Sequence, residues 1–385
     1  MLVHQYYYRD GRVRRYSETL VEQGNKVDVI CPEDFNQSNY SFNGVRIFTI
    51  PLERTYKQKS QYLIEYGLAF FLYTFRLIHL YLKYRYHIIH VHNIPDFMVF
   101  TAIVPKLFGA KIILDIHDPM PELFFSKYKS APNGIIARIL KFLEKISIKY
   151  SNVVITANDN FKNNLIIRGV PEKKITVINN VANANIFNRK KYNNGLQKNN
   201  DHFTLIYPGT IAPRYGLEIA IKALPALSKK IPDLQLLIIG NKVDYADELV
   251  SLAKKLDVLS FIEIRPAIPI NKIPQEIAKA DIGIYPALSD PHMDIATPTK
   301  VLEYAIMGIP IVASRLKVLE DLFDEVSIMF FKPGDVEEFS NCVFELYNNP
   351  TLRTQLVQNA DSVFVNKHSW ENEKRKYLDL LNNLI

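Results

Sequence analysis

The chain has 385 residues, of which 48% are hydrophobic and 23% charged, so each half can bury a core and extensive disorder is excluded. At roughly 100 to 200 residues per domain, this length is most simply two domains. The formal net charge of +7 favours an anionic partner, but zinc-finger spacing and the aromatic-interleaved pattern of RNA-binding domains are missing, so nucleic acid is not expected.

The amino terminus and the cysteines bear on the cellular compartment. The first residues carry arginines where a signal peptide needs its apolar stretch. Cys31 and Cys342 lie far apart in sequence and supply neither a disulfide framework nor a metal site. A reducing, cytoplasmic location is therefore expected.

Short apolar runs alternate with amphipathic helical patterns through the first half of the chain. A helical pattern occupies residues 12–24, and strands are expected at residues 1–5, 26–32, 45–51, 88–93, 111–118 and 152–158. Repetition of strand, helix and strand predicts a parallel, doubly wound α/β sheet whose ligands bind at the carboxyl ends of the strands.

The longest apolar segment, residues 63–82, is interrupted by Glu65, Arg76 and His79, which a membrane-spanning helix tolerates poorly. A buried helix is the interpretation we prefer. The aromatic residues of this segment and the KYRYH that follows also allow a second interpretation, in which the helix lies on anionic lipid. Peripheral contact with the inner face of a cell membrane therefore stays open.

Residues 188–202 are rich in Asn and Lys, have no apolar periodicity and are predicted to be a linker. Beyond them the strand and helix pattern restarts. Strands are expected at residues 203–209, 234–240, 262–268, 282–287 and 310–314, and helices at residues 217–230, 245–256 and 273–280. The expected domains are therefore residues 1–185 and residues 186–367, each doubly wound.

Two such domains facing each other would form a cleft lined by strand ends and helix amino termini, which favour an anion such as a diphosphate. The glycine fingerprint of dinucleotide-binding domains is missing from the first half, and the P-loop motif is missing from the chain. These two absences argue against a dinucleotide-dependent dehydrogenase and against a P-loop protein.

The stretch ATPTKVLEYAIMGIPIVAS, residues 296–314, is the most informative part of the chain. We expect a helix that starts near Pro298, with Thr297 or Thr299 as its cap. Lys300 and Glu303 would then share a face that looks into the cleft. A carboxylate there can accept hydrogen bonds from two neighbouring ribose hydroxyls, and an ammonium can meet a phosphate. An ordinary surface ion pair is the alternative.

Part of this stretch, PTKVLEYAIMGIPIVAS, resembles the carboxyl-terminal signature of the family 4 retaining glycosyltransferases, which have the GT-B fold. The resemblance extends over nearly the whole chain through RDGRVRRYSETLVEQGNKVDVI, IIHVHNIPD, LDIHDPMPE, VINNVANANIF, YPGTIAPRYGLEIAIKAL and ADIGIYPA. It implies two doubly wound Rossmann-like domains facing a central cleft. It also implies a last helix, residues 368–385 with Trp370 as its anchor, that packs back on the first domain; capping of its own domain is the alternative.

The resemblance implies catalytic and donor-binding roles for particular residues. Glu303 corresponds to the carboxylate that binds the donor ribose, and His117 to a histidine near the reaction centre, although a structural His–Asp pair remains an alternative. The implied catalytic residues are His117, Arg214, Lys300 and Glu303. The implied donor-binding residues are Gly209, Thr210, Arg214, Arg265, Ile268, Asp294, Thr297, Lys300 and Glu303.

On the acceptor side, the same resemblance implies a second set of residues and exposes several departures from the family pattern. The acceptor-side residues are Asp10, Gly11, Arg12, Asp118 and Glu122. Relatives commonly carry an Arg and a Lys where this chain has Thr210 and Tyr215, which leaves Arg214 and Lys300 as the expected cations beside the diphosphate.

The implied reaction transfers a sugar from a nucleotide-diphosphate sugar to a hydroxyl acceptor with retained configuration. A UDP-sugar is the favoured donor, and the acceptor would be a glycan or a lipid-linked molecule in bacterial surface polysaccharide or glycolipid synthesis. No cofactor and no metal are expected, since the Asp-x-Asp motif of metal-dependent transferases is missing. A sugar-nucleotide epimerase and a non-catalytic sugar-nucleotide binding protein remain alternatives.

Overall fold

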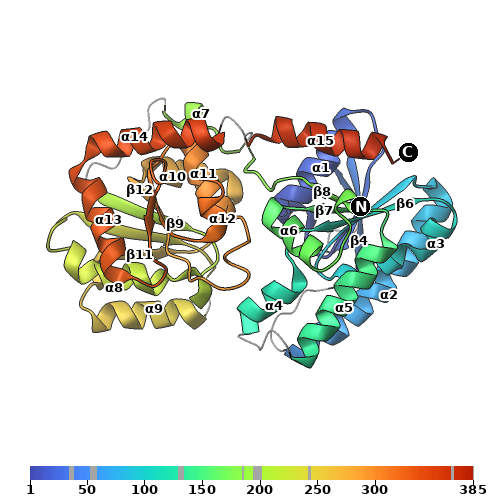
Figure 1. Cartoon of the computed structure of the whole chain (residues 1–385), viewed down its shortest axis with the longest axis horizontal. Coiled ribbons are helices and arrows are strands. Elements are labelled where there is room, and N and C mark those ends of the chain that lie inside the picture. Colours follow the sequence, from blue (N-terminus) through green and yellow to red (C-terminus); the bar gives the residue numbers. More distant parts are fainter. Residues whose placement is uncertain are drawn as a thin grey trace. The chain divides into compact units, whose positions relative to one another are not determined.

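The computed structural model describes residues 1–33, 39–52, 59–128, 134–183, 186–193, 202–241, 244–365 and 368–384. The chain divides into two compact units, Met1–Asn180 with Glu373–Ile385, and Val181–Asn372 (Figure 1). The boundary between the units therefore falls a few residues before the expected position after residue 185. Each unit is built around one sheet.

The expected linker was partly wrong. Residues 189–193 form helix α7 (Arg189–Asn193) within the second unit. The Arg189 guanidinium donates to both oxygens of Asp361 at 2.7 Å, and these bonds hold the segment to that unit. The remainder of the predicted linker, residues 194–201, lies outside the described residues.

The first unit contains a sheet in the order β3-β4-β2-β1-β5-β6-β7-β8 among the described residues. The strands are β1 (Leu2–Val3), β2 (Asp28–Pro32), β3 (Tyr40–Phe42), β4 (Val45–Ile50), β5 (Ile88–His92), β6 (Lys111–Ile116), β7 (Val153–Thr156) and β8 (Ile175–Val177). All pairings are parallel except that of β3 with β4. Strand β3 was not predicted, because its short and largely exposed sequence carries no apolar alternation.

Helices surround this first sheet. They are α1 (Gly11–Glu22), α2 (Lys59–Tyr84), α3 (Ile103–Leu107), α4 (Met120–Tyr128), α5 (Ile135–Tyr150), α6 (Asp159–Ile167) and the end of α15 (Trp370–Asn382), with the 3-10 segment η2 (Asp96–Ala102) between β5 and α3. No helix among the described residues is both long enough and apolar enough to cross a membrane.

The last helix, α15, joins the first unit from Glu373 onwards. The Glu373 carboxylate accepts a hydrogen bond from the Asn179 backbone amide at 2.8 Å, and the Tyr377 ring is fully buried. Trp370, the expected anchor, is partly exposed and precedes the residues that belong to this unit. A buried Glu and Tyr thus hold the end of the chain, rather than the tryptophan.

The second unit contains a wholly parallel sheet in the order β11-β10-β9-β12-β13-β14 among the described residues. Its strands are β9 (Phe203–Pro208), β10 (Leu234–Ile239), β11 (Ile262–Arg265), β12 (Ile282–Tyr285), β13 (Ile311–Ser314) and β14 (Met329–Phe331). Its longer helices are α8 (Leu217–Leu227), α9 (Asp244–Lys255), α10 (Ile273–Lys279), α11 (Thr299–Met307), α13 (Val336–Asn348) and α14 (Pro350–Ala360), and a short helix α12 (Lys317–Glu320) follows β13. Strand order reverses between β9 and β12, and ligands of such sheets bind at the carboxyl ends of the strands beside that reversal.

Candidate active site

A cavity of about 540 Å³ opens in the second unit at the carboxyl ends of β9 and β10, beside the reversal of strand order. Its walls come from the loops after those two strands, from the segment after β11 and from the beginning of α11. Five of the expected donor-binding residues line it: Gly209, Thr210, Ile268, Lys300 and Glu303. Residues scattered over almost a hundred positions of sequence are thus brought to one cavity.

Gly209 makes room for the lysine of this cavity. Its backbone has φ of +149°, a conformation that side chains other than hydrogen rarely adopt. A Cβ atom at this position would lie 2.9 Å from Cε of Lys300. The glycine at the end of β9 therefore lets the lysine side chain cross directly over the backbone.

Lys300 reaches the cavity among aromatic rings. Its Nζ lies 4.8 Å from the ring centroid of Tyr207, 4.7 Å from that of Tyr215 and 5.2 Å from that of Tyr285. Burial lowers the pKa of Lys300 to about 8, the Glu303 carboxylate opposes that shift, and the nearby Arg214 charge adds to it. The ammonium is held by ring faces and lacks the water that would stabilise its charge, so an arriving anion would favour its protonated form.

Glu303 is positioned through its neighbour Tyr304. The buried Tyr304 hydroxyl lies 3.1 Å from the carbonyl oxygen of Ile206 in β9 and 3.3 Å from that of Ile284 in β12, and it can donate to either. Gly283 allows this packing, because a Cβ there would lie 2.5 Å from the Tyr304 ring. Helix α11 is therefore tied to both strands at the reversal, and the residue before the tyrosine faces the cavity.

The beginning of α11 differs from the prediction. The helix starts at Thr299, its N-cap is Pro298, and no side chain of that cap makes a capping hydrogen bond. Proline has no hydroxyl, so the expected threonine cap was wrong. The shared face of Lys300 and Glu303 follows from their separation of three residues and does not depend on the cap.

Arg214 lies in the 3-10 turn η4 (Pro213–Tyr215), outside the lining of the cavity. Its Nη2 donates to the Tyr215 hydroxyl at 3.3 Å. Its Nε and Nη1 atoms are buried and have no hydrogen-bond partner within the described part of the chain. Buried guanidinium donors without acceptors are costly, and an anionic ligand would satisfy them.

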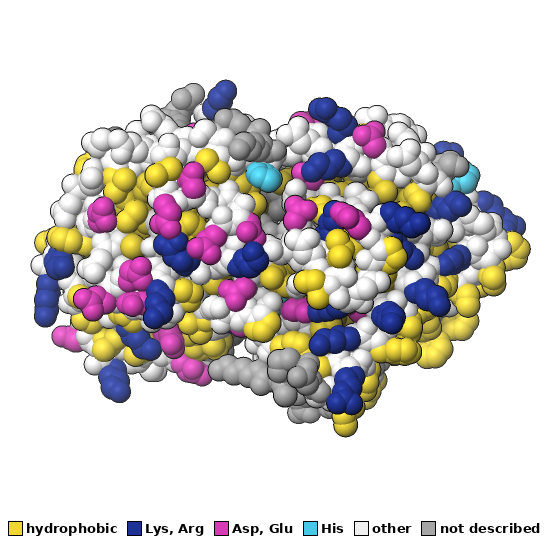
Figure 2. All heavy atoms as spheres, viewed as in Figure 1, with side chains coloured by type: hydrophobic (Ala, Val, Ile, Leu, Met, Phe, Trp, Pro, Cys, Tyr) yellow, Lys and Arg dark blue, Asp and Glu magenta, His cyan; other side chains and the backbone are white. Residues whose placement is uncertain are grey.

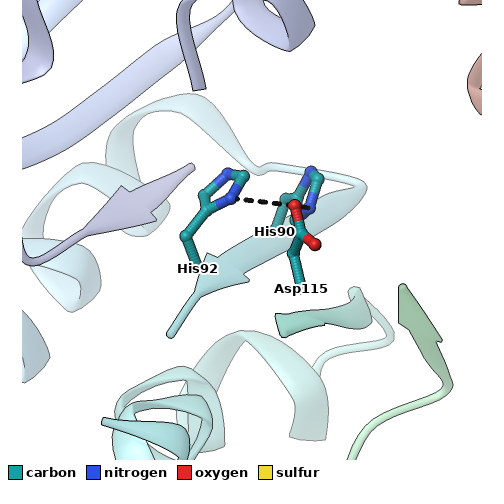
Figure 3. A group of neighbouring side chains, drawn as sticks. All are labelled: His90, His92 and Asp115. Atoms are coloured by element: carbon teal, nitrogen blue, oxygen red, sulfur yellow. Dashed lines mark ion pairs between the residues drawn. The ribbon is translucent and has the colours of Figure 1, made fainter. Parts of the chain in front are cut away.

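The first unit gathers a second cluster around Asp115, at the carboxyl end of β6 (Figure 3). Oδ2 of this carboxylate lies 3.2 Å from Nδ1 of His92, 3.3 Å from Nε2 of His117 and 3.7 Å from Nε2 of His90. The Arg12 guanidinium donates to both oxygens at 3.0 Å. Asp115 was not predicted as a functional residue, although it opens the DIHD motif.

The charges of this cluster separate its imidazoles. Burial alone would raise the pKa of Asp115, but the adjacent Arg12 and His117 hold it well below its ordinary value. Burial opposes protonation of His117, yet the carboxylate of Asp115 prevails and raises the pKa of that histidine. Burial lowers the pKa of His90 and, more strongly, that of His92. His117 is thus the imidazole that most readily carries a proton.

His90, His92 and Asp115 each place a possible metal-ligand atom within 4.8 Å of the others. Arg12 already supplies a positive charge to the same carboxylate through two hydrogen bonds. The arrangement works as an ion-pair network, and its outward member is His117, whose side chain is 18% exposed while the Asp115 side chain is fully buried.

Asp10, Gly11 and Asp118 lie near His117. The Asp10 carboxylate caps α1, since it accepts hydrogen bonds from the backbone amides of Arg12 at 3.1 Å and Val13 at 2.9 Å, and its other oxygen lies 4.0 Å from Nδ1 of His117. Gly11 is the first residue of that helix, and a Cβ there would meet ordinary contacts. The segment after β6 is also fixed by a residue that was not predicted.

That residue is Asn93, at the end of β5. Its side-chain oxygen accepts a hydrogen bond from the backbone amide of His117 at 2.7 Å, and its amide group donates to the Asp118 carbonyl at 2.7 Å. Asn93 belongs to the IIHVHNIPD segment, so a polar residue directly after a strand was the signal that could have identified it.

Family comparisons agree with this geometry. The family model "Glycosyl transferases group 1" matches residues 188–363, and the model "Glycosyltransferase Family 4" matches residues 12–185. The chain belongs to the family 4 glycosyltransferases. Its two Rossmann-like α/β domains are those of the GT-B fold. Neither family description supports the epimerase or the non-catalytic alternative.

Relatives of this glycosyltransferase are distant in sequence. A human protein of the phosphatidylinositol N-acetylglucosaminyltransferase is 20% identical over 371 residues, which cover 94% of this chain and 70% of that protein. The O-antigen biosynthesis glycosyltransferase WclY of Escherichia coli is 23% identical over 315 residues, covering 78% of this chain and 80% of that protein. The solved structure of Anabaena HepE in complex with UDP covers 99% of both chains with a TM-score of 0.72 at 14% identity.

Two acceptor-side predictions for this glycosyltransferase were wrong. Arg12 is 5% exposed, and all of its hydrogen bonds described above point inward to Asp115, with a further one to the Ile178 carbonyl at 2.9 Å. Glu122 is 8% exposed and forms an ion pair with Arg168. Both charges are consumed inside the first unit, because a buried charge needs a partner; they are structural rather than acceptor-binding.

Three donor-site predictions also place residues away from the cavity. Arg265 forms ion pairs with Glu263 at 2.5 Å and Glu276 at 2.8 Å at the end of β11. The Asp294 carboxylate accepts a hydrogen bond from the Ser289 hydroxyl at 2.8 Å, and burial raises the pKa of Asp294. Thr297 is partly buried and does not line the cavity. The side chains of neighbouring strands and loops determined these positions, and they cannot be read from one motif.

Proposed function

We propose that this glycosyltransferase transfers a sugar from a nucleotide-diphosphate sugar to a hydroxyl acceptor, with UDP as the nucleotide. The observation that carries the proposal is the cavity in which Lys300 and Glu303 stand side by side at the carboxyl ends of the strands. The UDP bound to the related fold of HepE supports the choice of nucleotide. Transfer proceeds with retained configuration and without a metal or an organic cofactor.

The cavity suits the parts of a uridine diphosphate. The Glu303 carboxylate accepts hydrogen bonds from the two ribose hydroxyls, which a carboxylate can do with its two oxygens. Apolar residues after β11, including Ile268 and Ile270, line the wall and would face the base. The diphosphate takes the place beside Lys300, where it supplies the acceptor that the Arg214 guanidinium lacks.

Departure of the nucleoside diphosphate is the step that most needs this positive charge. Negative charge grows on the leaving phosphate as the bond to the sugar breaks, and the sugar becomes oxocarbenium-like. Lys300 and Arg214 stabilise the phosphate charge, and such prearranged electrostatic stabilisation is usually the largest contribution to catalysis. With these cations in place, a metal ion is not required. His117, with its raised pKa, contacts the sugar or the leaving phosphate, and Asp10 and Asp118 contact the acceptor.

The acceptor is a glycan or a lipid-linked molecule. Two relatives support this class by name, since one is part of a phosphatidylinositol N-acetylglucosaminyltransferase and the other acts in O-antigen biosynthesis. We assign the protein to bacterial surface polysaccharide or glycolipid synthesis, in the cytoplasm and peripheral to the inner face of the cell membrane.

Replacement of the central carboxylate tests the proposal. Glu303→Ala removes hydrogen bonds to the ribose, and bonds to a charged group contribute about 1.5–3 kcal/mol each. We expect UDP affinity in isothermal titration calorimetry to fall by at least about tenfold, and sugar transfer from UDP-sugars to fall with it. Glu248→Ala, on the exposed side of α9, is the matched control. Unchanged UDP binding and turnover in a folded Glu303→Ala protein would refute the assignment.

A further inference from the structure

Helix α2 is apolar on two sides. Its inner side packs into the core through Tyr73, Leu77 and Leu80, which are almost completely buried. Its outer side carries a stripe of exposed large apolar residues, Ile64, Leu68, Phe71, Phe75 and Leu82, whose exposed fractions run from 49% at Leu68 to 74% at Ile64. The spacing of three, four or seven residues puts the stripe on one face of the helix. The expectation that this segment is a buried helix therefore holds for only half of its circumference.

The stripe continues onto the neighbouring helices of the first unit. Helix α3 and the residue after it expose Ile103, Leu107 and Phe108, and α5 exposes Ile135, Ile136, Ile139 and Phe142, all at least 50% exposed. The Tyr81 hydroxyl of α2 donates to the Phe108 carbonyl, and Lys106 of α3 lies 3.8 Å from the ring centroid of Tyr150 in α5. These contacts join the three helices. We call the exposed apolar residues of α2, Ile103–Phe108 and α5 the apolar face.

The charges around the apolar face have one sign. The acidic residues in the sequences of α2, α3 and α5 are Glu65 and Glu144, and both are buried, Glu65 beside His4 and Glu144 in an ion pair with Arg168. The exposed charges on these helices are basic: Lys83, Arg138, Lys145 and Lys149. Figure 2 shows yellow apolar side chains gathered along the margin of the first unit with dark blue Lys and Arg side chains beside them.

We propose that the apolar face docks on an anionic lipid bilayer. A contiguous apolar surface of this kind marks an interaction site. Helices that lie in a membrane interface combine a large apolar side with flanking Lys and Arg, and negative lipid headgroups attract that basic rim. A second copy of the chain is a poorer occupant, because two basic rims would repel each other across the contact.

The position of the apolar face fits a lipid-linked acceptor, so this inference rests on the proposed function. Helix α4 directly follows Asp118 and packs against α5. An acceptor whose lipid tail remained in the bilayer would thus present its polar end close to the segment that carries His117. The docking surface would select acceptors attached to a membrane over free sugars.

Vesicle flotation of the intact protein tests the apolar contribution. The wild type is expected to float with vesicles of phosphatidylcholine and phosphatidylglycerol. The triple variant Phe71→Ser, Phe75→Ser and Phe142→Ser should bind these vesicles at least tenfold more weakly. The matched control replaces exposed apolar residues elsewhere, Ile167→Ser, Leu259→Ser and Val326→Ser, and should bind as the wild type does.

A second pair of variants tests the basic rim. Arg138→Glu, Lys145→Glu and Lys149→Glu together should reduce binding to the anionic vesicles at least tenfold. The control Lys229→Glu, Lys254→Glu and Lys255→Glu changes the net charge equally on exposed positions of the second unit and should leave binding unchanged. Vesicles of phosphatidylcholine alone should bind the wild type more weakly than anionic vesicles.

Two results would overturn the docking proposal. One is equal flotation of the wild type and both test variants. The other is a wild type that does not float but forms dimers in light scattering, with the serine variant monomeric, since the apolar face would then join two copies. UDP affinity, measured on every variant, is expected to stay unchanged. A loss of lipid binding alone therefore bears on docking, while absence of UDP binding in the wild type bears on the proposed donor.

Discussion

Protonation of Lys300 is expected to control nucleotide affinity at slightly alkaline pH. Its pKa is lowered from 10.5 to about 8 in the free protein, because its ammonium is buried among tyrosine rings. A bound diphosphate would favour the charged form and raise that pKa again. Binding above pH 8 must therefore be accompanied by proton uptake, and affinity should fall as pH rises.

The size of this effect follows from the protonated fraction. With a pKa of about 8, roughly nine-tenths of the lysine is charged at pH 7 and roughly one-tenth at pH 9, and apparent affinity scales with the competent fraction. UDP affinity should therefore fall about tenfold between pH 7 and pH 9, or about 1.4 kcal/mol. The buried tyrosines nearby do not interfere, because burial raises the pKa of Tyr207, Tyr285 and Tyr304 well above 10.

Isothermal titration calorimetry with UDP at pH 7, 8 and 9, in buffers of different ionisation enthalpy, measures both affinity and proton uptake. At pH 8 the wild type should take up about half a proton. Lys300→Met should bind UDP about 10- to 100-fold more weakly at pH 7, from the loss of one charge-assisted hydrogen bond, and its affinity should no longer depend on pH. Lys222→Met, on an exposed lysine of α8, is the control. A wild type with constant affinity from pH 7 to 9, or a Lys300→Met variant that keeps the decline, would refute the reasoning.

Three further predictions concern how the site is held. Tyr304→Phe removes the hydroxyl that ties α11 to two strands and should lower the free energy of unfolding in urea by about 1–3 kcal/mol; an unchanged midpoint would show that the tie contributes nothing. Gly283→Ala forces a Cβ against the Tyr304 ring and should cost about 1–3 kcal/mol in the same measurement, and a stabilised variant would contradict this packing. Asp115→Asn leaves Arg12 buried without its anionic partner and should cost about 3–5 kcal/mol at pH 7. Since the pKa of Asp115 is depressed, its contribution is present above about pH 4 and is lost as pH falls below that value, so wild type and Asp115→Asn should converge in acid; a difference that persists at pH 3 would argue against the ion pair.

Local periodicity accounts for most of the predicted elements. Continuous apolar runs predicted the central strands of both sheets, since strands covered on both faces need no polar alternation. Strand β14 was not predicted, because its three residues are too few to show a pattern. The position of the cavity also followed from the order of strands and helices, because parallel sheets bind ligands at the carboxyl ends of their strands.

Lys300 and Glu303 could be placed together from sequence, because three residues along a helix always return to the same face. Neither the rings around Lys300 nor the strands that anchor Tyr304 could be foreseen in this way. Tyr207 is almost a hundred residues from the lysine in sequence, and only the folded sheet brings the two together. The lowered pKa of the lysine is therefore a product of tertiary packing.

The wrong predictions share one cause. Arg12, Glu122 and Arg265 are charged residues in motifs that suggested ligand contacts, and each is paired with a charge of its own unit. Whether a charge is free to meet a ligand depends on which partner the fold places beside it, and for Arg12 that partner, Asp115, lies 103 positions away. Local sequence decided which residues share a strand or a helix face. The packing of distant segments decided which of their charges remain available, because burial and pairing are properties of the folded chain.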